Sequence, residues 1–272
     1  MTQGKRAVQE LLERYDLTPR RALGQHFLAD PNLVHKMVRL AAVDAGGRVV
    51  EVGAGTGTLT RALGEADLQV VAYEVDERLR PLLGEVLEGL ANVELRMADA
   101  LAVLPEDLGE GPWTLVANLP YNIGTPLLLK MLTAGVNVDR FVVMVQKEVA
   151  DRLLTGPGSR TYGIPSVVAA LHADLHREFT VGPQVFVPPP LVESVVITLQ
   201  RHQAPPFASR AIELATAAFN QRRKMLRRSL VGAIPAVDEV LAAAGISGDL
   251  RAEQLSPLDY VTLAEQETQH GN

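Results

Sequence analysis

The sequence contains no cysteine, which excludes disulfide bonds and thiolate metal sites. The six histidines do not stand at the spacings of zinc ligands, so we expect no metal ion. No apolar run is long enough to cross a bilayer, and the first residues are charged where a secretory signal would be apolar. These absences predict a cytoplasmic protein that acts without a membrane.

An excess of positive charge is also missing, since the formal net charge is -6 and the pI is near 5.6. Proteins that coat nucleic acid through their total charge are basic overall, so any contact with nucleic acid must come from local patches. Hydrophobic residues make up 47% of the 272 residues, enough to bury one large core and a smaller second one.

Short β-rich runs alternate with helical stretches through much of the chain. This alternation predicts an α/β fold with a doubly wound, Rossmann-like parallel sheet. The predicted strands are residues 49–52, 70–73, 93–97, 115–117 and 141–145, and the predicted helices between them are residues 59–63, 79–90 and 126–132. Two helices precede the first strand, the second of them capped by Asp30. Residues 172–181 and 195–199 are expected to form a closing antiparallel pair.

A small helical domain is expected after the sheet. Two consecutive prolines stiffen the chain and stop regular structure, which predicts a linker over residues 203–207, between a first domain of residues 1–202 and a second of residues 208–272. The helices predicted for the second domain are residues 209–220, 221–231 and 237–244, and a last one that begins at Ser256 and Pro257.

Three glycines, Gly53, Gly55 and Gly57, directly follow the first predicted strand. Glycine lets the backbone approach a ligand closely, so a glycine turn at the carboxyl end of a buried strand is typical of a cofactor site. The spacing differs from that of the dinucleotide fingerprint. On the glycines alone, a tight turn without a ligand remains an alternative.

Two carboxylates favour a cofactor, because each follows a predicted strand and so lies at the same edge of the sheet. Glu74, ahead of Val75, stands about 20 residues beyond the glycine turn, where an acidic side chain accepts hydrogen bonds from ribose hydroxyls. Asp99, ahead of Ala100, can accept a hydrogen bond from the amino group of adenine. Either acid alone could cap a helix. Together with the glycines they favour an adenosyl ligand, which both nicotinamide cofactors and S-adenosylmethionine contain.

The segment Asn118-Leu119-Pro120-Tyr121 follows the fourth predicted strand at the same edge. An amide oxygen and a backbone carbonyl can accept the two N–H bonds of an adenine amino group and so direct its lone pair at a methyl donor. Proline restrains the residue before it, and a tyrosine ring offers a stacking platform for an extruded base. An isolated tetrapeptide of this kind could equally form an Asx-type turn. Its place beside the glycine turn favours methyl transfer.

The chain resembles the KsgA-type (RsmA) small-subunit ribosomal RNA adenine dimethyltransferases, relatives of the erythromycin-resistance methylases within the rRNA adenine methyltransferase family. The resemblance covers nearly the whole length. The matching segments are residues 23–28, 52–57, 118–122, 146–152, 158–163, 186–194 and 219–228. It implies a class I S-adenosylmethionine methyltransferase sheet followed by a small all-helical domain that binds RNA or the ribosome.

By this resemblance the cofactor is S-adenosylmethionine, which leaves as S-adenosylhomocysteine, and no metal is needed. The implied cofactor-binding residues are Gln25, His26, Leu28, Gly53, Gly55, Glu74, Val75, Asp99, Ala100 and Asn118. The family most often has Asn where His26 stands, so the paired contacts of an amide are absent there. The implied catalytic residues are Asn118 to Tyr121 and Phe186, a second aromatic expected to face the target adenine opposite Tyr121. A core phenylalanine beneath a loop is the alternative for Phe186.

The densest basic run is expected to bind RNA phosphates from one helix, on which residues 223 and 227, and 224 and 228, share a face. It consists of Arg222, Arg223, Lys224, Arg227 and Arg228. A solvated helix surface is the alternative. Weaker candidates for the same surface include Arg160 and Tyr162 in the loop of residues 156–163, whose glycines and proline suggest a mobile lid.

The resemblance implies dimethylation of N6 on two adjacent adenosines in the 3'-terminal hairpin of 16S rRNA, within the small ribosomal subunit or its precursor. We expect a monomer that also assists biogenesis of that subunit. The alternatives are an adenine-N6 methyltransferase for large-subunit rRNA or DNA, and a ribosome-assembly factor that acts chiefly by binding.

Overall fold

The structure is a computed structural model that describes residues 3–103, 108–109, 111–134 and 137–270. Its centre is a seven-stranded sheet with the strand order β4-β3-β2-β5-β6-β9-β7. The strands are β2 (Arg48–Val52), β3 (Gln69–Glu74), β4 (Val93–Met97), β5 (Trp113–Asn118), β6 (Val138–Gln146), β7 (Ala173–Val181) and β9 (Ser194–Arg201). The predicted doubly wound sheet is confirmed.

The first five strands of the sheet are parallel, and β9 runs antiparallel to β6. The chain passes outward from β2 through β3 to β4, then returns to the other side of β2 with β5 and β6. Strand order therefore reverses between β2 and β5. In open sheets of this kind, ligands bind outside the carboxyl ends of the strands at that switch point.

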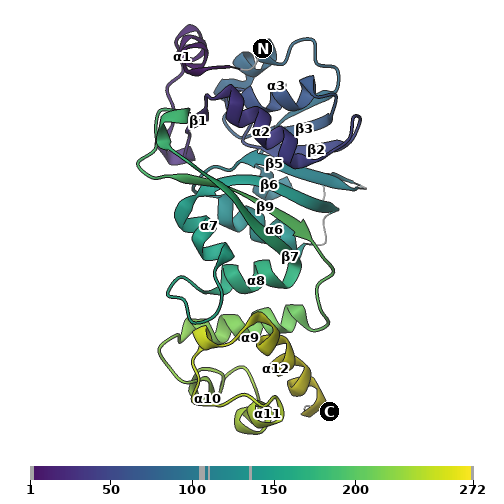
Figure 1. Ribbon diagram of the computed structural model, residues 1–272, viewed down its shortest axis with the longest axis vertical. Helices are drawn as coiled ribbons and strands as arrows, with labels where there is room; N and C mark the ends of the chain where they lie inside the picture. Colours follow the sequence, from purple (N-terminus) through teal and green to yellow (C-terminus); the bar gives the residue numbers. More distant parts are fainter. Residues whose placement is uncertain (1–2, 104–107, 110, 135–136, 271–272) are drawn as a thin grey trace. The chain divides into compact units, whose positions relative to one another are not determined.

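The helices of this part of the chain include those predicted and two more, at residues 100–103 and 147–154 (Figure 1). They are α1 (Lys5–Arg14), α2 (Pro31–Ala41), α3 (Thr58–Glu65), α4 (Arg80–Val86), α5 (Ala100–Val103), α6 (Gly124–Thr133) and α7 (Lys147–Leu154). The Asp30 side chain caps α2 as predicted, because it accepts a hydrogen bond of 3.0 Å from the amide of Leu33. Apolar side chains such as Val34, Met37 and Leu63 are buried against the sheet.

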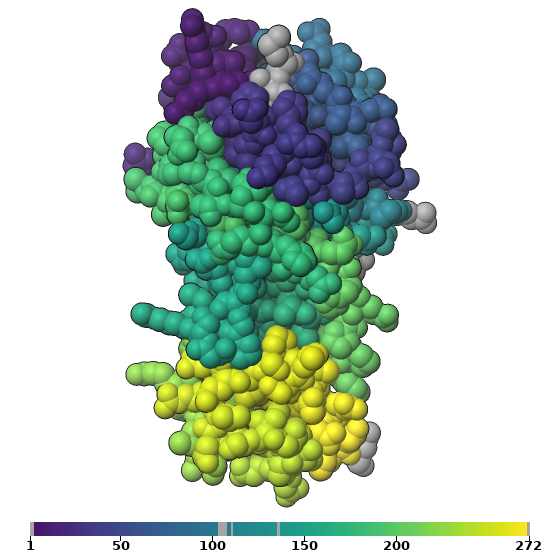
Figure 2. Space-filling model, viewed as in Figure 1, coloured from purple at the N-terminus to yellow at the C-terminus, as the bar shows by residue number. Residues whose placement is uncertain are grey.

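A second, two-stranded sheet was not predicted. It joins β1 (Phe27–Leu28) to β8 (Phe186–Val187), with Leu28 opposite Phe186. Helix α1 packs beside β8, and Figures 1 and 2 show the purple N-terminal residues next to this green segment. The pairing brings the N-terminal segment to the rim of the large sheet.

The chain divides into two compact units, residues 1–150 with 176–201, and residues 151–175 with 202–272. Our predicted domains placed residues 151–175 with the sheet. They group instead with the C-terminal helices, because α8 (Ile164–His172) packs on two of them. The C-terminal helices are α9 (Ala208–Asn220), α10 (Leu226–Ser229), α11 (Val237–Ala243) and α12 (Pro257–His270).

The predicted helix over residues 221–231 is wrong. Met225 forms a β-bridge with Arg251, and the amide of Leu226 donates to the carbonyl of Leu250, at 2.7 Å. This pairing holds Met225 in an extended conformation, so only the four residues of α10 are helical. Tertiary pairing here outweighs local helix propensity. The shared helix faces expected for the basic run therefore do not exist.

Tyr162 was predicted to lie on the RNA-binding surface, and this prediction is also wrong. Its side chain is buried in the core of the C-terminal unit, and its hydroxyl donates to the carbonyl of Leu255, at 2.9 Å. The amide of Gly158 donates to the carbonyl of Glu253, at 2.7 Å. These bonds anchor the loop of residues 156–163 within its unit.

No helix in the part of the chain that the structure describes has the length and the apolar character of a membrane span.

Candidate active site

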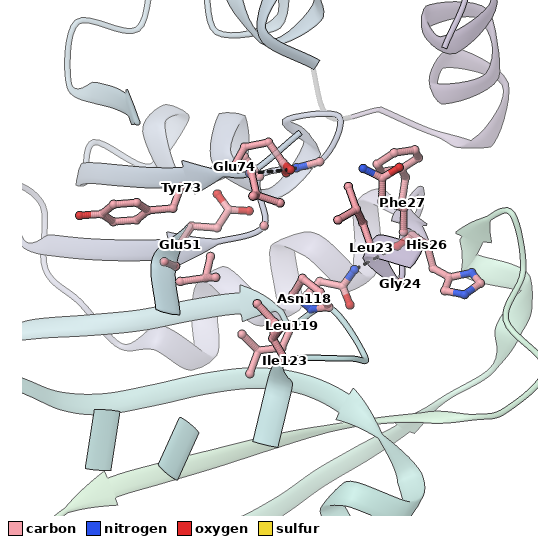
Figure 3. Close-up of a pocket in the computed structure, with 18 of the residues that line it drawn as sticks. Leu23, Gly24, His26, Phe27, Glu51, Tyr73, Glu74, Asn118, Leu119 and Ile123 are labelled. Atoms are coloured by element: carbon pink, nitrogen blue, oxygen red, sulfur yellow. Dashed lines mark hydrogen bonds between the residues drawn. The ribbon is translucent and has the colours of Figure 1, made fainter. Parts of the chain in front are cut away.

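A cavity opens at the carboxyl ends of β2, β3 and β5, where the strand order reverses (Figure 3). It brings together every predicted cofactor residue and the whole Asn118–Tyr121 segment. The N-terminal residues 23–28 form part of its wall. The positions that the sequence assigned to one sheet edge thus meet around one space.

The glycine turn approaches the rest of the cavity wall so closely that an added side chain would crowd its neighbours. Gly53 has φ +82°, and a Cβ atom there would lie 3.2 Å from Cγ of Pro120. Gly55 has φ +57°, and a Cβ atom there would lie 3.0 Å from the ring of Phe27. Glycine is needed at both positions for its left-handed backbone and for its lack of a side chain.

Glu74 ends β3 and is only 6% exposed. One of its carboxylate oxygens accepts from the amide of Gly55, at 2.8 Å, and the other accepts from the amides of Val75 and Asp76, both at 2.9 Å. Burial raises the pKa of Glu74, and these three amides oppose that rise. Two carboxylate oxygens offer about four acceptor sites, so Glu74 retains capacity for a ligand hydroxyl.

Asp99 lies in the same wall with an exposed side chain. Its Oδ1 accepts from the amide of Leu101, at 2.9 Å, at the start of α5. The helix-capping alternative for this residue is therefore correct as far as one oxygen is concerned. The second oxygen can still serve a ligand, since one cap bond does not saturate a carboxylate.

Asn118 ends β5 and faces the cavity across from Glu74 (Figure 3). Its amide nitrogen donates to the carbonyl of His26, at 3.2 Å, which fixes the orientation of the side chain. Its Oδ1 is buried and has no hydrogen-bond partner within the described part of the chain. An unpaired buried acceptor costs about 1–3 kcal/mol, so this oxygen is suited to accept from a bound molecule.

Tyr121 lies beside Asn118 at the rim. Its hydroxyl shares a 2.8 Å hydrogen bond with Oγ of Ser194, and its ring centroid lies 5.2 Å from that of His26. Nδ1 of His26 is 2.8 Å from the carbonyl of Pro188, to which it donates as the Nδ1–H tautomer. The two rings are thus held by bonds to Pro188 and Ser194, at the two ends of the segment that joins β8 to β9.

The structure does not place Phe186 at the cavity. Its side chain is 0% exposed and belongs to the main core, opposite Leu28 in the small sheet. This is the core position that the sequence left as an alternative. The β1–β8 pairing causes it, because it turns the Phe186 ring inward.

Gln25 uses its side chain to hold the N-terminal segment. Its amide nitrogen donates to Oδ2 of Asp76, at 3.0 Å, and its oxygen accepts from the amide of Arg20, at 2.7 Å. Asp76 also accepts two hydrogen bonds from the guanidinium of Arg78. Arg78 and then Gln25 hold the pKa of Asp76 down to about 2. This Asp76 clasp fastens residues 20–25 against the end of β3.

Glu51 is a site residue that the sequence analysis missed. It is 1% exposed, lines the cavity, and has its carboxyl group beneath that of Glu74 in the view of Figure 3. Its Oε2 has no hydrogen-bond partner among the described residues. Burial, aided by the charge of Glu74, raises the pKa of Glu51 to about 8. The available signal was an acid inside the apolar strand between Val50 and Val52.

The basic run divides into two groups. Arg222 pairs with Glu253, at 2.6 Å, and Arg227 pairs with Asp249. The other three cations, Arg223, Lys224 and Arg228, are exposed and form no ion pair with described residues. Two charges therefore stabilise the C-terminal unit, and three are available to an anionic partner.

Comparison with known proteins gives concordant matches. The family model for ribosomal RNA adenine dimethylase matches residues 17–269. The chain is 40% identical to a protein of Corynebacterium jeikeium over 96% of this chain and 94% of that one, and 44% identical to one of Phenylobacterium zucineum over 95% and 91%. Both relatives are named ribosomal RNA small subunit methyltransferase A.

Two solved structures share the fold. A dimethyladenosine transferase from Plasmodium falciparum superposes with a TM-score of 0.78 at 23% identity, covering 90% of this chain and 98% of that one. The 23S rRNA methyltransferase ErmE superposes with a TM-score of 0.69 at 26% identity, covering 89% and 100%. The sheet and the helical unit after it therefore have the architecture of class I methyltransferases of this kind.

Proposed function

The chain belongs to the ribosomal RNA adenine dimethylase family, and on that premise we propose its reaction and the residues that perform it. It is an S-adenosylmethionine-dependent rRNA adenine dimethyltransferase. It dimethylates N6 of two adjacent adenosines in the 3'-terminal hairpin of 16S rRNA. Each adenosine receives two methyl groups, and S-adenosylhomocysteine leaves after each transfer.

The unpaired Oδ1 of Asn118 is the single observation that best supports this reaction. The lone pair of the adenine amino group is delocalised into the ring, which makes it a poor nucleophile. An acceptor that takes one of its N–H bonds favours the pyramidal amine of the transition state. Because His26 already holds the other end of the Asn118 amide, the oxygen is oriented before the substrate arrives.

The cavity fits the proposed methyl donor, since the glycine turn leaves room where side chains would fill it. S-adenosylmethionine, when bound, supplies a methyl carbon activated by its sulfonium. We assign Glu74 to the ribose and Asp99 to the adenine, with the backbones of Val75 and Ala100 beside them. Gly53 and Gly55 border the central portion, and the buried Leu28 and His26 border the methionine end.

The target base enters at the other end of the cavity. Tyr121 supplies the stacking surface, since its hydroxyl is tied to Ser194 and its ring is held beside His26. Leu119 and Pro120 shape the turn, and the carbonyl of Leu119 is the proposed second acceptor for the amine. Phe186 supports this wall from the core, and it reaches the base only if the small sheet opens.

The substrate is ribosomal RNA, and the small subunit or its precursor is the proposed form in which the chain meets it. Relatives at 40–44% identity bear the small-subunit name, whereas ErmE, a 23S rRNA enzyme, is 26% identical. We therefore prefer 16S rRNA to large-subunit RNA or DNA. Acting on ribosomes, the protein works in the cytoplasm, and we propose that it does so as a monomer that needs no metal.

Arg223, Lys224 and Arg228 are the proposed phosphate contacts of the C-terminal unit, and Arg222 and Arg227 hold their segment in shape. Binding to small subunits should weaken with salt, because phosphate contacts release counterions. Changing Arg223 and Lys224 to Gln should flatten the slope of log affinity against log salt by about 0.7 for each phosphate that the protein no longer neutralises. An unchanged slope would remove these residues from the interface.

The reaction is tested with under-methylated small subunits, labelled S-adenosylmethionine and the purified protein. Mass spectrometry of the RNA nucleosides should show N6,N6-dimethyladenosine, and its absence would refute the assignment. Asn118→Ala should still bind the subunits but transfer label about 100- to 1000-fold more slowly. If that variant restored every effect of the protein on subunit assembly, a binding role would be separate from the chemistry.

A further inference from the structure

The segment between β8 and β9 exposes two aliphatic side chains next to the reaction end of the cavity. Leu191 is 102% exposed, so its side chain contacts almost nothing in the protein, and Val192 is 45% exposed. A single exposed leucine is ordinary on a protein surface. This one calls for a functional explanation because its segment is bonded at both ends to residues that line the cavity.

The segment is fixed at both ends to residues that line the cavity. The carbonyl of Pro188 accepts from His26, at 2.8 Å, and the side chain of Ser194 bonds to Tyr121, also at 2.8 Å. The segment therefore leaves the rim beside His26 and returns to it beside Tyr121, with Leu191 between these two anchors.

The segment is also stiff. Residues 188–190 are three consecutive prolines, each with a fixed φ, directly before Leu191. On the other side, the carbonyl of Glu193 accepts from the amide of Lys147, at 3.0 Å, and its carboxylate pairs with the Lys147 ammonium, at 2.9 Å. An apolar side chain held out on a braced support has the form of a wedge.

Methylation of N6 requires the adenine to leave its stack, because the amine must reach Asn118 inside the cavity. Extrusion leaves a gap between the neighbouring bases, and the base returns unless something fills that gap. Proteins that open stacked nucleic acid insert apolar side chains, leucine among them, between base steps. Leu191 lies on the segment that is bonded to both His26 and Tyr121, two residues that line this end of the cavity.

We propose that Leu191, supported by Val192, inserts into the RNA stack as a wedge that takes the place of the extruded target adenosine. This proposal rests on the proposed reaction with RNA. It gives Leu191 a role toward the bases that neighbour the target adenosine. The wedge determines how long the adenine stays in the cavity, and it makes no contact with the methyl donor.

The test compares wild type with Leu191→Ala, Leu191→Asp and the matched control Leu191→Met, which keeps a long apolar side chain. The single-turnover rate of methyl transfer to under-methylated small subunits is measured at saturating cofactor. Leu191→Ala should slow transfer about tenfold and Leu191→Asp more, since the leucine side chain offsets part of the cost of unstacking one base step. Leu191→Met should stay within about twofold of wild type.

Cofactor affinity, measured by calorimetry, and the melting temperature should be the same in all four proteins, because Leu191 is exposed and outside the cofactor end. A Leu191→Ala protein as fast as wild type would overturn the wedge, and so would a parallel loss of cofactor affinity. If wild type itself transfers no methyl group to the subunits, the proposed function fails and the wedge fails with it.

Discussion

The two ends of the cavity differ in how far the protein itself satisfies their polar groups. At the cofactor end, the Glu74 carboxylate accepts three backbone hydrogen bonds, and the Asp76 clasp fixes the wall beside it. At the reaction end, Oδ1 of Asn118 has no partner among described residues. The first end is thus rigid before any ligand binds, whereas the second keeps an oriented acceptor for the substrate.

Replacing Asn118 should impair the reaction end of the cavity and leave the cofactor end largely intact. Asn118→Ala removes the acceptor for the amine, and loss of one such preorganised group costs about 100- to 1000-fold in rate. Methyl transfer to small subunits should fall by that factor, while cofactor affinity measured by calorimetry falls far less. A variant that transfers methyl groups at the wild-type rate would show that the unpaired oxygen has no part in the chemistry.

One polar group at the cofactor end is not satisfied by the protein. It is the carboxyl group of Glu51, whose Oε2 has no hydrogen-bond partner among the described residues. Its pKa in the folded protein, about 8, lies above the ordinary value of 4.5, so ionisation of Glu51 opposes folding. This cost is absent below about pH 4.5, grows as the pH rises to about 8, and then stays constant.

Glu51→Gln removes that charge and should therefore be increasingly more stable than wild type between pH 5 and pH 8. The change in relative stability should amount to roughly 2–4 kcal/mol. Urea unfolding at pH 5, 6.5 and 8 measures it. If the difference in unfolding free energy between the two proteins stayed constant over this range, Glu51 would not be held in its neutral form.

Glu74→Gln should lower cofactor affinity by about 10- to 30-fold, because a charge-assisted acceptor becomes a neutral amide that also lacks one acceptor oxygen. Asp99→Asn is the matched control, since asparagine still caps α5. It should reduce affinity less, because Asp99 is exposed and water competes for its contacts. If the two variants bound the cofactor equally weakly, the contrast between a buried and an exposed cofactor contact would not hold.

The cofactor edge was predictable from the sequence because its signals are local. A buried strand running into glycines, and acids that directly follow strands, keep their meaning whatever the rest of the chain does. The same holds for Asp30, whose cap needs only the next turn of α2. The predicted sheet and the gathering of Asn118, Glu74 and Gly53 around one cavity are accordingly found.

What the sequence could not provide depends on contacts between distant segments. The burial of Phe186 follows from pairing of two-residue strands that are more than 150 residues apart, and neither strand has a periodic pattern. The false helix over residues 221–231 has the same origin, since the Met225–Arg251 bridge decides its conformation. Glu51 differs, because the apolar residues on either side of it in β2 already indicate a buried acid from the sequence alone.

Replacing Asp76 tests the cofactor end, where the clasp holds the cavity wall in place. Asp76 has its pKa held at about 2 by Arg78 and Gln25, below the ordinary value of 3.8. A lowered pKa stabilises the fold above about pH 4, and that stability is lost as the pH falls toward 2. Asp76→Asn should therefore be less stable than wild type by about 1–2 kcal/mol at pH 7, with the difference shrinking below pH 4.

Glu77→Gln is the matched control for the clasp, because Glu77 pairs with Arg80 on the surface, where water screens the pair and its contribution to stability is small. Thermal unfolding of both variants at pH 7, 4 and 3 measures the difference. Asp76→Asn should also weaken cofactor binding a few-fold, since residues 20–25 lose a tether to the cavity wall. A stability difference that persists unchanged at pH 3 would mean that Asp76 acts through packing and not through its charge.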